Sequence, residues 1–314
     1  MKIGNIQLKN RLILAPMVDV TDLAYRVLCR RYGAALAFTE MTVIDSILSG
    51  AALSKKLIET NDEDKPSGIQ IAGYDPLMFK KVIPYLKDFD IIDVNFGCPV
   101  HKAENCGIGA VLLKEPKRIK EILKTLKKNT DKIVTAKVRL GYDTNNISEI
   151  AKVVEDSGVD AITVHARTAI VGRGVKADLE SIKLVKEQVS IPVIGNGDVF
   201  TPEDAKRMLK IADFAMIARG AIGDPSIFRR TLNYLDNGLI EEKPNFDQKV
   251  SMFMEYCKLV EEYNLKRINL KERLMYFLKS LENSSILREK VSKCKNNQEM
   301  FKLIGVNLGV STTH

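Results

Sequence analysis

The segment from residue 133 to residue 164 reads IVTAKVRLGYDTNNISEIAKVVEDSGVDAITV. Two mainly apolar runs, residues 133–138 and 161–164, lie on either side of a helix-like stretch, residues 147–157, that stops at Gly158. Runs that are apolar along their whole length are typical of parallel strands buried on both faces. The segment therefore predicts one strand–helix–strand unit of a parallel sheet.

The same alternation continues along the chain on both sides of this unit. Six further apolar runs precede helix-like stretches, at residues 12–15, 35–38, 68–71, 91–94, 192–194 and 214–217. Helix starts are marked by the N-cap candidates Thr21 and Asp22 and by the pairs Asp75-Pro76, Glu115-Pro116 and Thr201-Pro202. Eight such units predict an α/β fold, a (β/α)8 TIM barrel. An open doubly wound sheet is the alternative, but no GxGxxG follows the first strand, which favours the barrel.

The pattern changes after Gly238. A polar linker at residues 241–245 contains the helix breaker Pro244, and no β-like run follows it. Apolar residues then recur at helical spacing, first over residues 253–263 and again over residues 270–281. We therefore expect the barrel to span residues 1–240 and a small C-terminal all-α domain to span residues 246–314.

The charge of the chain is concentrated in this C-terminal part. The sequence has 48 Lys and Arg against 40 Asp and Glu, a net charge of +8. From Tyr263 onward there are ten Lys and Arg against four Glu, so this stretch carries +6 of the total. A basic helical face beside an active site predicts an anionic partner such as RNA, whereas an ordinary solvated helix exterior is the alternative.

The composition limits the cellular setting. The chain is 45% hydrophobic and 28% charged, which is typical of a folded protein and excludes wholesale disorder. No apolar run approaches the roughly 20 residues of a membrane span, and residues 1–4 are too polar for a signal peptide. The five cysteines form no CxxC pair, which argues against a disulfide framework. We expect a cytoplasmic monomer that contacts no membrane.

Polar or reactive residues follow every predicted strand. In a TIM barrel, the active site lies at the carboxyl ends of the strands, so these residues should converge. In chain order, the candidates are Ala15, Pro16, Met17, Glu40, Gln70, Asn95, Cys98, Lys137, Arg139, His165, Arg167, Asn196, Gly197, Asp198, Ala218, Arg219 and Gly220.

Two features of this set suggest what the site could bind: a phosphorylated ligand, and a group that carries negative charge. The glycines of the last two loops, together with Arg219, predict a phosphate site, which TIM barrels often place after strands seven and eight. Lys137 ends an apolar strand, so its ammonium group could stabilise negative charge on a reduced flavin. The alternative for Lys137 is an ion pair with a carboxylate such as Glu40.

Cys98 lies in a Gly-Cys-Pro turn at the end of the fourth strand. A thiol there could act as a general acid that delivers one proton to carbon, while a small buried hydrophobic residue is the alternative. Cys98, His101 and Cys106 also form a C-x2-H-x4-C pattern, but no fourth ligand lies nearby in the sequence. We therefore expect no metal.

In this order and spacing, the motifs resemble those of the tRNA-dihydrouridine synthases, along nearly the whole chain. The matching stretches are residues 14–17, 70–73, 93–99, 107–110, 137–141, 165–168, 195–198 and 218–221. The resemblance implies an FMN-binding TIM barrel followed by a helical RNA-binding domain. It also implies that NADPH, or NADH, reduces the flavin, and that uridines of tRNA, first of all those of the D-loop, are then reduced at the C5=C6 bond.

The resemblance also implies a role for each candidate residue. Cys98 resembles the proton donor to C5 of uracil, Asn95 the residue that holds the target base, and Arg139 and Arg167 residues on the RNA side. Lys137 and His165 resemble contacts of the isoalloxazine ring. The other cofactor-binding positions are Ala15, Pro16, Met17 and Gln70 around the ring, and Asn196, Gly197, Asp198, Ala218, Arg219 and Gly220 around the phosphate.

The sequence departs from the family between residues 169 and 179, where Arg173 and Lys176 are present but the usual aromatic residue is not. This departure concerns RNA contact and target position rather than flavin chemistry. Three alternatives remain open. They are a dihydroorotate- or dihydropyrimidine-dehydrogenase-like FMN enzyme acting on a free pyrimidine, an RNA-binding protein without catalysis, and a sugar-phosphate isomerase. The basic helical tail and the stretch at residues 195–198 count against the free-pyrimidine enzyme, and Cys98, Lys137 and His165 count against a protein without catalysis. The isomerase has no use for Cys98 or the tail, so the synthase is favoured.

Overall fold

The structure is a computed structural model that describes residues 1–171, 174–279, 281 and 284–306. Within these residues, eight parallel strands form a closed ring in which the last strand pairs with the first. The ring runs through β3 (Leu12–Leu14), β4 (Leu36–Phe38), β6 (Ser67–Ala72), β7 (Ile91–Phe96), β8 (Ile133–Arg139), β9 (Ala161–His165), β10 (Val193–Asn196) and β11 (Phe214–Ile217). The predicted TIM barrel is therefore confirmed.

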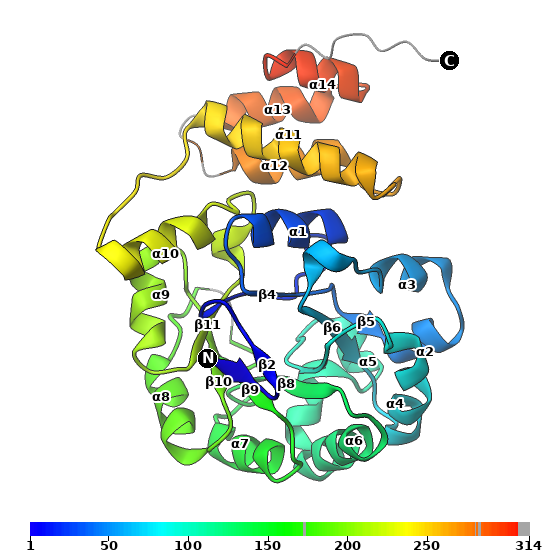
Figure 1. Ribbon diagram of the computed structural model, residues 1–314. Coiled ribbons are helices and arrows are strands. Elements are labelled where there is room, and N and C mark those ends of the chain that lie inside the picture. The colour runs from blue at the N-terminus through cyan, green and yellow to red at the C-terminus, as the bar shows by residue number, and fades with distance from the viewer. Residues whose placement is uncertain (172–173, 280, 282–283, 307–314) are drawn as a thin grey trace.

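Helices follow the strands and surround the ring (Figure 1). They are α1 (Leu23–Arg31), α2 (Ile44–Leu48), α3 (Ala52–Leu57), α4 (Pro76–Val82), α5 (His101–Asn105), α6 (Pro116–Asn129), α7 (Ile147–Glu155), α8 (Leu179–Gln188), α9 (Pro202–Leu209) and α10 (Ile227–Asn237). The side chains of Asp22, Asp75 and Thr201 cap α1, α4 and α9 by accepting hydrogen bonds from backbone N–H groups of the first turn. These local signals place the helix starts where the sequence predicted them.

Side chains that alternate along the strands fill the inside of the barrel. Toward the amino ends of the strands the filling is apolar and includes Ile133, Ala161 and Phe214. The hairpin of β1 (Lys2–Ile3) and β2 (Ile6–Gln7) closes this end, because Ile3 and Leu8 are buried in the same cluster. Figure 1 shows the hairpin across the centre of the ring. The sequence did not predict this hairpin, nor the short strand β5 (Thr42–Val43) that pairs with β6.

The C-terminal helices pack on one side of the barrel, next to α1 (Figure 1). They are α11 (Phe246–Glu262), α12 (Leu270–Leu278), α13 (Ser284–Lys293) and α14 (Asn297–Leu303). Tyr25 of α1 makes edge-to-face contacts with Tyr256 and Phe277, and Asp22 accepts a 2.8 Å hydrogen bond from the Tyr256 hydroxyl group. Arg273 lies 3.1 Å from the same carboxylate. The N-cap of α1 is therefore also an anchor for these helices.

Residues 307–314, the end of the predicted helical domain, lie outside the described residues. Of the helices that the structure describes, none is both long enough and apolar enough to cross a membrane.

Candidate active site at the barrel mouth

The inward-facing positions at the carboxyl ends of the strands carry polar side chains. Ladder pairing places Asn95 beside Lys137, and His165 beside both Arg139 and Asn196. Because every second residue of a strand points inward, these side chains share one end of the barrel. The structure thus brings together candidates from β7, β8, β9 and β10 that are up to 101 positions apart in the sequence.

A buried chain of hydrogen bonds links the barrel interior to the Cys98 turn. Asp93 accepts hydrogen bonds from Thr135 Oγ1 and Gln70 Nε2, both at 2.7 Å. Asn95 Nδ2 donates to Gln70 Oε1 at 2.8 Å, and Asn95 Oδ1 accepts from the backbone N–H groups of Gly97 and Cys98 at 3.0 and 2.8 Å. Both carboxamides that the sequence suggested as ligand contacts are therefore engaged with the protein.

Asp93 and Thr135 were not among the sequence-predicted site residues. They precede Asn95 and Lys137 by two positions, so the period of two along a strand could have placed them on the same inward face. Burial raises the pKa of Asp93 to about 6, while the hydrogen bonds from Thr135 and Gln70 and the charge of Lys137 act in the opposite direction. The carboxyl group thus titrates near neutral pH.

The half-buried Cys98 is held through its backbone on two sides. Its N–H group donates to Asn95, and its carbonyl oxygen accepts a 2.9 Å hydrogen bond from the N–H group of Ala110. Gly109 has a φ of 75°, and a Cβ atom there would lie 2.7 Å from the Cys98 carbonyl oxygen. Only glycine therefore allows residues 109–110 to close against the turn. Arg139 Nε adds a 2.7 Å hydrogen bond to the carbonyl oxygen of Gly97.

Lys137 and His165 present polar groups that the protein does not use. Within the described part of the chain, Lys137 Nζ and the ring nitrogens of His165 make no hydrogen bond or ion pair. Burial, followed by the charge of Arg139, lowers the pKa of Lys137 to about 8. Burial, followed by the nearby cations, lowers the pKa of His165 to about 2, so its imidazole is neutral at physiological pH.

Glu40 does not neutralise Lys137. Its carboxylate accepts a 2.8 Å hydrogen bond from the N–H group of Asp19 and lies 3.7 Å from Arg267. The alternative that Lys137 pairs with Glu40 is therefore not found, and the lysine is left as a cation at the mouth.

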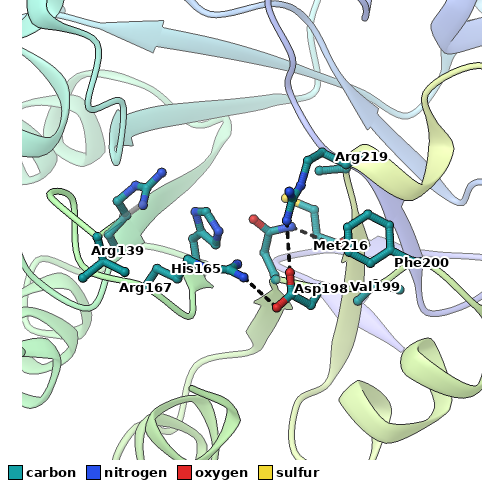
Figure 2. A pocket seen from close by; sticks show the side chains of 12 residues that line it. Arg139, His165, Arg167, Asp198, Val199, Phe200, Met216 and Arg219 are labelled. Atoms are coloured by element: carbon teal, nitrogen blue, oxygen red, sulfur yellow. Dashed lines mark hydrogen bonds and ion pairs between the residues drawn. The ribbon is translucent and has the colours of Figure 1, made fainter. Parts of the chain in front are cut away.

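The loops after β10 and β11 are joined by one carboxylate. Asp198 accepts hydrogen bonds from Arg167 at 2.6 Å, from the N–H group of Ala177 at 2.9 Å and from Arg219 at 3.0 Å. Figure 2 shows Asp198 between the two guanidinium groups, with the ring of Phe200 beside Arg219. Burial alone would raise the pKa of Asp198, but the hydrogen bonds from Arg167 and Ala177 hold it below its usual range.

Backbone N–H groups in these two loops remain available to a ligand. Those of Gly197 and Gly220 donate no hydrogen bond within the residues that the structure describes. A Cβ atom on Gly220 would collide with the carbonyl oxygen of Val199, and it would lie 3.1 Å from the Cδ1 atom of Ile227. Free amides beside the exposed cation Arg219 form a donor set that fits a phosphate group.

One pocket at the mouth, shown in Figure 2, reaches Gly197 of this cradle. Gly220 and the candidates Gln70, Asn95, Cys98 and Lys137 are not in its lining. Its lining includes the predicted residues Arg139, His165, Arg167, Asn196, Gly197, Asp198, Ala218 and Arg219, together with Val171, Val199, Phe200 and Met216, which were not predicted. Ala15, Pro16 and Met17 are not in this lining: Ala15 is buried in the barrel and the other two are half-buried in the loop after β3. Arg173, part of the unusual stretch, lies outside the described residues.

The residues present therefore fit a flavin mononucleotide. The amides of Gly197 and Gly220 with Arg219 suit its phosphate, and the unpaired Lys137 suits the negative charge of a reduced isoalloxazine ring. The neutral His165 can donate or accept a hydrogen bond at the same mouth.

Comparison with solved structures shows the same fold. Histamine dehydrogenase from Rhizobium sp. 4-9 superposes with a TM-score of 0.58 at 18% identity, over 82% of this chain and 50% of that one. A variant of NCR from Zymomonas mobilis superposes with a TM-score of 0.53 at 16% identity, over 79% of this chain and 93% of that one. At these identities the likeness concerns the barrel fold alone.

Sequence relatives are much closer. tRNA-dihydrouridine synthase B of Vibrio parahaemolyticus is 41% identical over 298 residues, which cover 92% of both chains. A probable tRNA-dihydrouridine synthase of Rickettsia bellii is 36% identical over 269 residues, covering 83% of this chain and 82% of the relative. The family described as dihydrouridine synthase (Dus) matches residues 13–309. With the barrel, the mouth residues and this match over nearly its whole length, the chain belongs to the dihydrouridine synthase family, a family of oxidoreductases.

Proposed function

We propose that this chain reduces the C5=C6 bond of uridines in the D-loop of tRNA, with FMN as its bound cofactor and NADPH as the reductant. The observation that carries the proposal is that three groups without a hydrogen-bond or ion-pair partner among the described residues lie at the carboxyl ends of the neighbouring strands β8 to β11. They are the Lys137 ammonium group, the neutral His165 ring and the amide cradle of Gly197 and Gly220. When bound, FMN supplies the hydride that C6 of uracil receives.

The chain's own residues bind and orient the cofactor. Lys137 and His165 contact the isoalloxazine ring, and the lysine stabilises the negative charge of its reduced form. Asn196, Gly197, Arg219 and Gly220 hold the phosphate, in loops that Asp198 ties together through Arg167 and Arg219. Ala15, Pro16 and Met17 pack at the side of the ring, in the loop after β3.

Cys98 delivers the proton to C5 of uracil, so that the hydride and the proton complete the reduction of one double bond. Its thiol lies on a turn whose backbone is fixed by Asn95 and Ala110. Arg139 is held against this turn by the carbonyl oxygen of Gly97 and faces the base side. The uridine must leave its stack to reach the mouth, which costs a few kcal/mol and is least demanding in an RNA loop.

The C-terminal helices α11–α14 supply the RNA platform. The stretch from Tyr263 onward carries a net charge of +6, and several of its lysines are exposed. Such a surface attracts the phosphate backbone irrespective of sequence. Because uridine modification of tRNA takes place where tRNA matures, the location proposed for the protein is the cytoplasm.

The test maps dihydrouridine by position in unmodified tRNA after incubation with purified, FMN-loaded protein and NADPH. We expect one or a few D-loop uridines to be reduced. The Cys98→Ala variant should keep its flavin and its reduction by NADPH, but lose uridine reduction by about 10²- to 10⁴-fold, the range for a general acid. Cys106→Ala is the matched control because Cys106 is exposed at the end of α5, and it should keep full activity.

Other outcomes would favour the alternatives. Reduction of free uracil or orotate, with tRNA left unchanged, would favour an enzyme of free pyrimidines. tRNA binding without any consumption of NADPH would favour an RNA-binding protein without catalysis.

A further inference from the structure

The hydrogen-bond chain from Thr135 to Cys98 has a fixed direction. An ionised carboxylate only accepts hydrogen bonds, so Gln70 must turn its amide nitrogen toward Asp93. Its oxygen then faces Asn95, which must donate to it. The Asn95 oxygen is left to face the backbone N–H groups of the Cys98 turn.

The Cys98 turn, at the other end of this hydrogen-bond chain, requires the same orientation of the two carboxamides. Backbone N–H groups only donate, so the turn requires the oxygen of Asn95 and not its nitrogen. If either carboxamide flipped, two donors or two acceptors would face each other in a buried space. Gln70 and Asp93 are 1% exposed and Asn95 is 8% exposed, so solvent offers little replacement.

We propose that Asp93 is a positioning residue for the proton donor: through Gln70 and Asn95, it sets the backbone orientation of the Cys98 turn and hence the place of the thiol. The inference rests on the proposed function, in which Cys98 protonates C5. Asp93 touches neither the turn nor the thiol in the hydrogen-bond network, so it reaches the Cys98 turn through the two carboxamides, while its charge also acts on Lys137.

Variants that place the carboxylate at a different link of the hydrogen-bond chain test this role. In Asp93→Asn, the anchor can both donate and accept, so either orientation of Gln70 is satisfied and Asn95 is held in its orientation only by the N–H groups of the turn. In Gln70→Glu, two carboxylates face each other. In the double variant Gln70→Glu/Asp93→Asn, the acceptor-only group sits one link nearer to Asn95, which must again donate to it and keep its oxygen on the turn.

The readouts separate positioning from a general loss of structure. For Asp93→Asn, we expect single-turnover uridine reduction to fall at least fivefold, while FMN content and flavin reduction by NADPH stay within twofold of wild type. Gln70→Glu should fall further. Because Gln70 is also a predicted contact of the flavin ring, the double variant is assayed with FMN at saturation, and it should recover to within threefold of wild type. A double variant no better than Asp93→Asn, or an Asp93→Asn variant within twofold of wild type, would overturn the proposal.

A second readout does not need activity. The rate at which iodoacetamide alkylates Cys98 in the holoprotein, followed on the Cys98 peptide, should rise at least threefold in Asp93→Asn and return toward wild type in the double variant. The exposed Cys106 is the internal control and should not change. If the wild type forms no dihydrouridine, the proposed function fails, while the alkylation rates still decide whether Asp93 positions the turn. Equal rates at Cys98 in all variants would refute the positioning role.

A pH profile gives an independent check. Gln70 of β6 and Thr135 of β8 face Asp93 with hydrogen bonds, and Lys137 of β8 faces it as a charged group. A protonated Asp93 can donate, so the direction of the chain is lost as the pH falls below the pKa of about 6 and single-turnover reduction should decline. Thr135→Val removes a hydrogen bond that lowers this pKa and should move the decline to higher pH, whereas Thr135→Ser should not. If Asp93→Asn fails to fold, the two Thr135 variants provide the test. A decline of single-turnover reduction that begins at the same pH in Thr135→Val as in the wild type would contradict the proposal.

Discussion

Replacing Gly220 by alanine should weaken FMN binding without unfolding the barrel. A Cβ atom at this position would collide with the carbonyl oxygen of Val199 and lie 3.1 Å from both the Cα atom of Phe200 and the Cδ1 atom of Ile227. Two of these three neighbours are backbone atoms, which cannot rotate away as a side-chain end can. The loops after β10 and β11 must therefore move apart at this point.

The size of the effect follows from the hydrogen bond that a bound phosphate loses when the two loops move apart. The amides of Gly197 and Gly220 lie one on each loop, and within the described residues neither donates to the protein. A phosphate cannot keep both hydrogen bonds at full strength once the loops move apart. One hydrogen bond to a charged group contributes about 1.5–3 kcal/mol. Without it, the Kd for FMN rises by about 10- to 150-fold.

The assay is titration of the apoprotein with FMN, followed by the quenching of flavin fluorescence. Gly174→Ala is the matched control, because Gly174 lies in the neighbouring loop, has no positive φ, and has no atom of the described residues within 4 Å of a Cβ. Its Kd should stay within twofold of wild type. A Gly220→Ala variant that binds FMN as tightly as this control would refute the amide cradle as the phosphate site.

The remaining predictions concern charge, anchoring and RNA. The Lys137 cation should be lost as the pH rises through its pKa of about 8, so that only about a tenth remains at pH 9. The affinity for reduced FMN should therefore weaken between pH 7 and pH 9 in the wild type but not in Lys137→Met, and equal profiles would exclude the interaction. Tyr256→Phe removes the hydroxyl group that donates to the buried Asp22, and urea unfolding should show that the free energy of unfolding falls by about 1.5 kcal/mol. A decrease below about 0.5 kcal/mol would mean that Arg273 alone suffices as the anchor. Lys279→Ala and Lys290→Ala, both at exposed positions, should weaken tRNA binding and make its salt dependence less steep. The slope of log K against log salt concentration should change by about one for each phosphate that the variant no longer neutralises. Unchanged binding would rule out this face as the RNA platform.

The site was less predictable than the barrel because residue type does not show how an amide is used. Gln70 and Asn95 are polar residues at strand ends, and as such they predicted ligand contacts. In the structure, their oxygen and nitrogen atoms bind Asp93, each other and the Cys98 turn. Only the three-dimensional neighbours of each side chain reveal these bonds, which leave one amide N–H of each residue for a ligand.

Arg167 illustrates the same point for a charged residue. It follows the sixth barrel strand, which suggested a place on the RNA side together with Arg139. Arg167 is 5% exposed, and its guanidinium group binds Asp198 and the carbonyl oxygen of Val175, so that it braces the loops of the phosphate cradle. A guanidinium group has five donors, and which acceptors take them depends on loops that are not adjacent in sequence.

Local signals in the sequence were sufficient for the barrel itself. Apolar runs form strands and capped stretches form helices because hydrophobic period and capping act over a few residues, and their eightfold alternation leaves one compact arrangement. The N-terminal hairpin was missed because residues 1–8 are too short to show a period; Ile3 and Leu8 are buried only because the barrel end is there to receive them. Tertiary structure likewise decides the charge of Lys137 and the neutral state of His165, because burial and the charges on neighbouring strands set their protonation. It also decides the direction of the hydrogen bonds that start at Asp93, because that direction depends on which groups face each other and on whether the carboxyl group is ionised. Neither protonation nor hydrogen-bond direction is a property of a residue alone.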